Sequence, residues 1–226
     1  MAYKVFTNGS VLQASEINEN LMRQAVATFT NAAARTAAIA SPVEGQFTYL
    51  ADTDRLQFWN GSAWVSPFGS TLLASATITS TASFSVNDVF TSEFDNYQIV
   101  FNGNSGSGVG IHCRVRSAGT DVSTGYSSVE GLLVGSFAPQ DRTVNTATTM
   151  PLVTKNAFGD KFCNATIYSP FLSQPTRLSS YGGNDAACVS FCAGDLQNSN
   201  SYTGITILSS NGTNFTGRLQ IYGLRK

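Results

Sequence analysis

The sequence contains a single histidine that could serve as the general base for a nucleophilic side chain. His112 lies between Ile111 and Cys113, in a stretch that alternates apolar and polar residues. A Ser-His-Asp arrangement would have to use this histidine as its base. Because a lone histidine in a strand pattern more often faces solvent or packs against neighbours, the sequence predicts no such catalytic group.

The cysteines have the wrong spacing for a metal site or a local disulfide. Zinc sites use cysteine and histidine at short paired spacings, whereas only Cys188 and Cys192 lie close together here. In a strand these two would be about 13 Å apart, beyond the ~7 Å between Cα atoms that a disulfide spans. We therefore expect buried free thiols that act as small apolar side chains, as in a reducing cytoplasm. The same interpretation applies to Cys113 and Cys163.

Three further motifs are too incomplete to indicate a cofactor or an active site. Asp52 and Asp54 lack the other acidic ligands of a calcium loop, so we interpret them as a turn. The glycine-rich segment 103–110 is followed by no helix pattern that would hold a phosphate. The carboxylates after residue 120 lie in or near turns and form no pair that we would assign to glycoside cleavage. The sequence therefore predicts a protein that is not an enzyme and that binds no metal or cofactor.

The composition indicates a folded protein with a neutral polar surface. Of the 226 residues, 42% are hydrophobic and 12% are charged, and the formal net charge is −1. Such a chain lacks the clustered Lys and Arg that sequence-independent nucleic-acid binding needs. No apolar run approaches the ~18 residues of a membrane span, and the first residues contain no apolar signal core. We therefore expect no nucleic-acid partner, no membrane insertion and no secretion.

One segment near the start of the chain has a helical pattern. Residues 14–38 are rich in alanine, and Ile17, Leu21, Ala25 and Phe29 recur at a spacing of four and mark one face. Two interpretations of this predicted helix remain open. It either docks on its own domain, or it forms a trimer or inserts into a partner.

The segment 41–69 has the pattern of a small β unit. Asn60-Gly61 is a strong signal for a two-residue hairpin turn. The two tryptophans of the chain, Trp59 and Trp64, lie in this segment, and a sheet this small needs large aromatic side chains to cover one face. We expect three strands, at Gln46–Leu50, Arg55–Trp59 and Ser62–Val65.

Residues 70–226 have the pattern of one all-β domain. Short alternating segments are separated by turn clusters rich in Asn, Gly and Ser, which is typical of a sandwich or jelly roll. The predicted fold is mainly β, with a short N-terminal helix in residues 1–40, a small three-stranded β unit in 41–69 and a C-terminal antiparallel β-sandwich, jelly-roll-like, in 70–226. Aromatic residues beside turns are candidates for ligand contact or for core packing: Tyr126, Phe137, Tyr181 and Tyr202.

Three stretches together resemble tail-associated virion proteins of tailed bacteriophages. The opening segment 6–18 has an Asn-Gly turn followed by Ala-Ser-Glu-Ile-Asn, similar to the start of many phage minor tail and fibre proteins. The second stretch consists of Leu-Met-Arg-Gln at residues 21–24 and Ala-Arg-Thr-Ala-Ala-Ile at residues 34–39. The third, 42–65, runs from Glu-Gly through two aromatic strands to Asn-Gly and Trp-Val, and is similar to a module common in such proteins. The end of the chain, 215–224, also resembles the last strand of phage fibre tip domains.

This resemblance implies a non-enzymatic structural protein of the virion tail, assembled in the cytoplasm of the bacterial host. Residues 1–40 would attach to tail or baseplate proteins as part of a homotrimer, and the C-terminal sandwich would contact a glycan or protein on the host cell surface. A surface of Ser, Thr, Asn and Gly with exposed aromatic residues suits glycans. The alternatives are a capsid decoration (cement) protein, a baseplate or adaptor protein, a glycan-degrading tail enzyme and a cellular lectin-like module.

Overall fold

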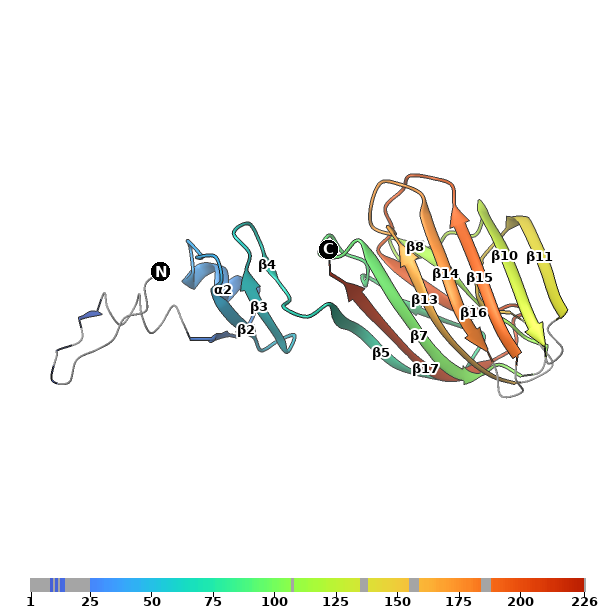
Figure 1. Cartoon of the computed structure of the whole chain (residues 1–226), viewed down its shortest axis with the longest axis horizontal. Coiled ribbons are helices and arrows are strands. Elements are labelled where there is room, and N and C mark those ends of the chain that lie inside the picture. Colours follow the sequence, from blue (N-terminus) through green and yellow to red (C-terminus); the bar gives the residue numbers. More distant parts are fainter. Residues whose placement is uncertain are drawn as a thin grey trace. The chain divides into compact units, whose positions relative to one another are not determined.

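The computed structural model describes residues 25–106, 108–134, 138–154, 159–183 and 188–225, together with residues 9, 11, 13 and 14. The fold is mainly β, with 56% of residues in strands and 4% in a helix. The chain divides into two compact units, Met1–Gly69 and Ser70–Lys226. Figure 1 labels the strands of both units.

The first unit contains a four-stranded sheet in the order β1-β2-β3-β4. Strands β2 (Phe47–Leu50), β3 (Arg55–Trp59) and β4 (Trp64–Val65) pair in antiparallel fashion, close to the bounds that the sequence predicts. The turn between β3 and β4 is held by Asn60, whose side-chain oxygen accepts hydrogen bonds from the backbone of Ser62 and Ala63. Gly61 has φ of +94°, which a glycine adopts without strain.

Over residues 25–38 the structure has a strand and a seven-residue helix in place of the one continuous helix that the sequence predicts. The helix α2 spans only Ala32–Ala38, and Ala27–Phe29 forms strand β1, which pairs parallel to β2. Ala25 lies at a bend, so it shares no helical face with Phe29. Thr28, Phe29 and Thr30 favour extended backbone, and the helix begins only where the Asn31 side chain caps it by accepting from the backbone of Ala34. The other two residues of the predicted face, Ile17 and Leu21, lie outside the described residues.

The helix places Arg35 over the sheet of the first unit. The Arg35 guanidinium lies 4.5 Å from the centre of the Trp64 ring and donates a hydrogen bond to the side-chain oxygen of Gln57. Burial lowers the pKa of Arg35. The Trp59 and Trp64 rings are half-buried and meet edge to face at 5.6 Å. A cation and two aromatic rings therefore replace part of the aliphatic core that such a small unit cannot build.

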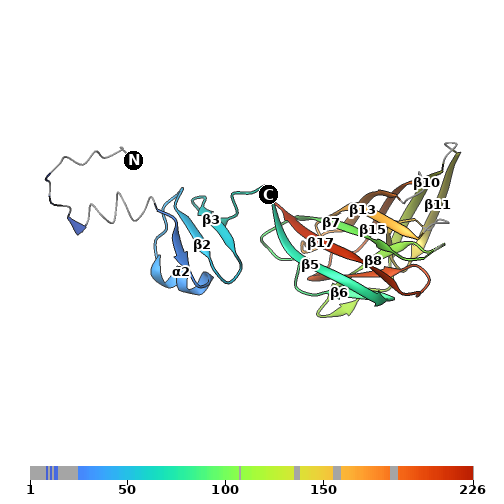
Figure 2. The same cartoon turned by 90° about the horizontal axis from the view of Figure 1, so that it is seen from below.

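The second unit contains two antiparallel sheets. The larger sheet has the order β11-β10-β15-β14-β13-β7-β17-β5, and the smaller has β12-β8-β16-β6 with β9 paired to β8. Figures 1 and 2 show the large sheet as a broad twisted layer with the small sheet against one side of it. The strands of the large sheet are β5 (Ser70–Thr81), β7 (Asn96–Asn104), β10 (Tyr126–Val134), β11 (Ala138–Ala147), β13 (Asp160–Tyr168), β14 (Thr176–Gly183), β15 (Cys188–Leu196) and β17 (Phe215–Leu224). Those of the small sheet are β6 (Ser83–Val86), β8 (Ile111–Ser117), β9 (Thr120–Asp121), β12 (Met150–Val153) and β16 (Gly204–Ser209).

Side chains of both sheets form one buried core between them. In β8 the alternation that the sequence predicts is present: Ile111, Cys113 and Val115 are buried, whereas the residues between them are half-exposed. The core of a β-sandwich is built in this way from the inward face of each sheet. Other core members come from the large sheet (Ile99, Phe101, Cys163, Ile167, Leu219, Ile221) and from the small sheet (Leu152, Ile205, Ile207).

Candidate functional site

Two of the four aromatic candidates, Tyr126 and Tyr202, are buried in the core. Tyr126 is fully buried, and its hydroxyl donates to the backbone oxygen of Val122 and accepts from the backbone nitrogen of Val115. Tyr202 is also buried, and its hydroxyl donates to the side-chain oxygen of Asn198. Both phenols therefore find partners inside the unit, which lets the rings enter the core although turns lie nearby. Of the two interpretations, core packing therefore applies to both tyrosines, and neither contacts a ligand at the surface.

The structure places Tyr181 on the surface, and Phe137 lies outside the described residues. Tyr181 stands on the outer side of β14, facing away from the small sheet, and is directly opposite Phe191 of β15. Their ring centroids are 5.3 Å apart and the ring planes are tilted by 59°. We call the large exposed side chains on this part of the outer sheet surface the aromatic face: Val129 (45% exposed), Phe162 (45%), Tyr181 (51%) and Phe191 (48%).

Polar side chains flank the aromatic face, and the acidic residues among them are Asp160, two positions before Phe162, and Asp141, opposite Gly131. Asn164 of β13 lies opposite Tyr181, and its side-chain oxygen accepts a hydrogen bond of 2.9 Å from the Gln98 amide of β7. Ser179, two residues before Tyr181, shares a hydroxyl hydrogen bond of 3.2 Å with Tyr168. The nearest charged pair across these strands is Arg177 and Asp195, beyond Ser179 and Ala193 on the same face. The aromatic face therefore combines apolar rings with amides and hydroxyls.

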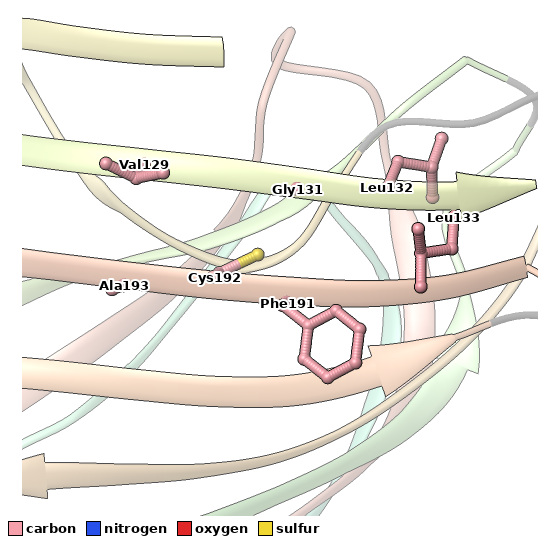
Figure 3. A pocket seen from close by; sticks show the side chains of 7 residues that line it. All are labelled: Val129, Gly131, Leu132, Leu133, Phe191, Cys192 and Ala193. Atoms are coloured by element: carbon pink, nitrogen blue, oxygen red, sulfur yellow. The ribbon is translucent and has the colours of Figure 1, made fainter. Parts of the chain in front are cut away.

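A hollow lies beside the Phe191 ring, between β10 and β15 (Figure 3). Its volume is about 350 Å³. Gly131 is directly opposite Phe191 in the register of the two strands. Because glycine has no side chain to cover the backbone, the space next to the ring stays open. The hollow is lined by Val129, Gly131, Leu132, Leu133, Phe191, Cys192 and Ala193.

The aromatic face was only partly predictable, since Tyr181 was the one member chosen from the sequence. Phe162, Phe191 and Val129 belong to alternating strands, and alternation separates two faces without saying which one is buried. In β15, for example, Val189, Phe191 and Ala193 face outward while Cys188, Ser190 and Cys192 face inward. The outward set is at least as apolar as the inward one, so the sequence of β15 does not identify the buried face.

The single histidine lies in a polar cluster at the side of the small sheet. The Nδ1 atom of His112 is 2.8 Å from the Thr149 hydroxyl, and its Nε2 atom is 3.7 Å from a carboxylate oxygen of Glu130. In a Ser-His-Asp triad Nε2 forms the hydrogen bond to the nucleophilic hydroxyl, and Nδ1 forms the hydrogen bond to the carboxylate. In His112, Nδ1 faces a hydroxyl and Nε2 faces a carboxylate, so the geometry departs from that arrangement.

All four cysteines are buried and free, as the sequence predicts. Burial raises the pKa of Cys163 and of Cys192 to about 12, and it raises the pKa of Cys113 further. These three thiols are therefore protonated at neutral pH and lack the thiolate that nucleophilic attack requires.

Neither a metal cluster nor a membrane-spanning helix occurs in the part of the chain that the structure describes. Within it, no three His, Cys, Asp or Glu side chains come together in a way that could hold a metal ion. None of the helical residues described forms a helix long and apolar enough to cross a membrane. Comparison of the sequence with protein-family models and with curated proteins found no match.

Proposed function

We propose that this chain is a non-enzymatic structural protein of a tailed-phage virion, a homotrimeric tail fibre that attaches through its N-terminal segment. In this proposal the unit 70–226 is the distal part and contacts the host cell surface. The aromatic face is the observation that carries the proposal. It presents three aromatic rings and a valine to solvent, among amides and hydroxyls, on strands that hold them in place.

Exposed aromatic side chains in one patch indicate a binding surface. Large apolar side chains scattered singly over a protein need no explanation, but a contiguous patch usually marks an interaction site. The four residues of the aromatic face come from β10, β13, β14 and β15, which are consecutive neighbours in the large sheet. A site built on strands is more rigid than one built on loops. It therefore loses little entropy when a ligand binds.

The resemblance of residues 1–65 to tail-associated proteins supports the attachment role of the first unit. The exposed aromatic residues of this unit fit a contact with another protein. The ring of Phe47 lies 5.8 Å from that of Phe58 on the side of the sheet opposite the one that carries Thr48 and Gln57. Phe68 is also exposed. These side chains are candidates for burial against tail or baseplate proteins or against the other two copies.

We also propose a jelly-roll-like connectivity for the second unit. Its first and last strands, β5 and β17, pair in the large sheet, and the next strands inward, β6 and β16, pair in the small sheet. A chain folded as a double ribbon across two sheets has this nesting. The connectivity supports a tail-fibre function only as a scaffold, because one such fold serves many functions.

The experiment that tests the proposed function is binding of the fluorescently labelled full chain to intact cells of candidate bacterial hosts. Surface polysaccharide stripped from the same cells serves as the competitor. Saturable binding that the polysaccharide reduces is the expected result. If the folded protein binds no host cell, the alternative function applies, a capsid decoration (cement) or baseplate or adaptor protein, and antibody labelling of particles would then locate it.

A further inference from the structure

We infer that the hollow beside Phe191 receives a methyl group of an uncharged saccharide whose ring stacks on Tyr181 and Phe191. The methyl group belongs either to an acetamido substituent or to a 6-deoxy sugar. This inference rests on the proposed function, since it names the class of host ligand that the aromatic face would bind.

The two rings provide the stacking surface for the sugar. Tyr181 and Phe191 are each about half exposed, and each is fixed from one side by the other ring at 5.3 Å. Aromatic rings offer a large contact area at a low cost in conformational entropy. The face of a pyranose ring that carries axial C–H groups is apolar, so it gains contact with an aromatic ring while its hydroxyls stay at the edge.

The hollow adds a preference for a small apolar substituent. Its volume of about 350 Å³ is at the lower end for ligand pockets, so it can hold the methyl group together with the part of the sugar that carries it. The lining side chains are apolar, and the two positions that leave the space open, Gly131 and Ala193, have no side chain or only a methyl group. A sugar hydroxyl placed there would lose hydrogen bonds to water without gaining a partner side chain. A methyl group has no such cost and gains from leaving water.

The polar residues on the same face suit the rest of the saccharide. The hydrogen bond from Gln98 to Asn164 uses one amide nitrogen and one amide oxygen. The Asn164 nitrogen and the Gln98 oxygen remain as a donor and an acceptor for sugar hydroxyls. The register row through Tyr181 contains Val100, Asn164, Phe191 and Gly131, and it continues to Asp141 of β11. The row holds one acidic residue and no cation, so an uncharged ligand matches it, whereas an acidic polysaccharide would meet a like charge.

The first test compares two tetrasaccharides that differ in the acetamido group alone. Calorimetric titration of the full chain with chitotetraose and with cellotetraose measures the contribution of that group. A third titration uses a rhamnose-containing tetrasaccharide, which supplies the methyl group as a 6-deoxy sugar. We expect saturable binding of chitotetraose, of the rhamnose-containing tetrasaccharide, or of both. Cellotetraose, which carries no methyl group, should bind at least about tenfold more weakly. Equal binding of all three ligands, or binding of none, would overturn the inference.

The second test uses variants at the site and a matched control. Phe191→Ala removes the stacking surface, and Ala193→Leu fills the hollow from an exposed position. Each should weaken binding of the methylated ligand by about tenfold or more. Leu72→Ala is the control, because Leu72 is 48% exposed on β5 of the same sheet and away from the hollow. An equal loss of affinity in all three variants, or no loss of affinity in the first two, would show that the saccharide does not bind at this site.

Two further outcomes separate this inference from the proposed function and from self-association. If the wild-type chain binds host cells but Phe191→Ala and Ala193→Leu bind them equally well, the proposed function holds and the saccharide site is wrong. If Phe191→Ala changes the oligomeric state measured by analytical ultracentrifugation, the aromatic face is a contact between copies of the chain, which also overturns the saccharide site.

Discussion

Tyr181 and Phe191 lie directly opposite each other on β14 and β15, with their ring centroids 5.3 Å apart and both rings half exposed. Cross-strand aromatic pairs stabilise a sheet by a fraction of a kcal/mol to about 1 kcal/mol. A pair that served stability alone could sit on the inward face, where burial adds much more. The outward position of both rings leaves them available for the ligand contact proposed above.

The aromatic face should be nearly dispensable for folding. Phe191→Ala is expected to lower the free energy of unfolding by about 1 kcal/mol or less, because the ring is already half in water. Phe101→Ala removes a ring that is fully buried between the sheets, so it should cost about 3–5 kcal/mol. Urea denaturation followed by far-UV circular dichroism measures both. Similar losses for the two variants would show that Phe191 has a structural role.

The parts of the fold that the sequence predicts well depend on local signals. The strands Phe47–Leu50, Arg55–Trp59 and Trp64–Val65 follow from the Asn-Gly turn and the aromatic residues around it. The buried and half-exposed positions of β8 follow from strict alternation. Both signals lie within a few residues of the elements that they predict.

The parts that the sequence does not predict depend on distant contacts. Ala27–Phe29 lies in an alanine-rich stretch that favours a helix, yet it forms a strand because it pairs with residues 48–50, about 20 positions later. The aromatic face shows the same limit. Which side of β15 is outward depends on where the small sheet packs, and this cannot be read from alternation in β15 itself, because Val189, Phe191 and Ala193 are as apolar as the buried set.

The contact between Arg35 and Trp64 should stabilise the first unit. Arg35→Leu removes the cation over the Trp64 ring and leaves the buried Gln57 side chain without this hydrogen bond. We expect the free energy of unfolding of this unit to fall by about 1–3 kcal/mol. Tryptophan fluorescence during urea denaturation reports on this unit alone, because Trp59 and Trp64 are the two tryptophans of the chain.

The control for this experiment is Arg177→Leu, which removes an exposed arginine from the second unit. It should leave the tryptophan transition in place. An unchanged transition for Arg35→Leu would mean that the cation and the ring contribute nothing measurable to the stability of the sheet.

The three buried thiols make stability depend on pH in the alkaline range. The folded-state pKa of Cys163 and of Cys192 is raised to about 12 from an ordinary value of 9.0, and that of Cys113 is raised in the same direction. Between these values the folded chain keeps thiol protons that the unfolded chain loses. The thiol contribution is therefore complete below about pH 9 and is lost progressively as the pH rises toward 12.

Ellman's reagent at pH 8 tests the protonation and burial of these thiols. We expect the variant Cys188→Ser, which retains the other three cysteines, to react only after denaturant is added. Urea denaturation of the same variant at pH 7 and pH 10 should give a lower free energy of unfolding at the higher pH. Fast reaction of the folded variant at pH 8 would show that at least one of the three thiols is accessible and ionised.

The last prediction concerns the division of roles between the two units. The segment Ser70–Lys226 has its own core, formed by both of its sheets, so it should fold cooperatively when it is produced without residues 1–69. If the N-terminal unit assembles the fibre, this fragment is a monomer in light scattering, whereas the full chain is a homotrimer at micromolar concentration. Removing residues 1–40 alone deletes β1, α2 and Arg35 from the first unit, so it should unfold the four-stranded sheet of that unit as well as abolish the trimer. A fragment 70–226 that remains trimeric would instead place the contact between copies on the sandwich, with the aromatic face as the first surface to examine.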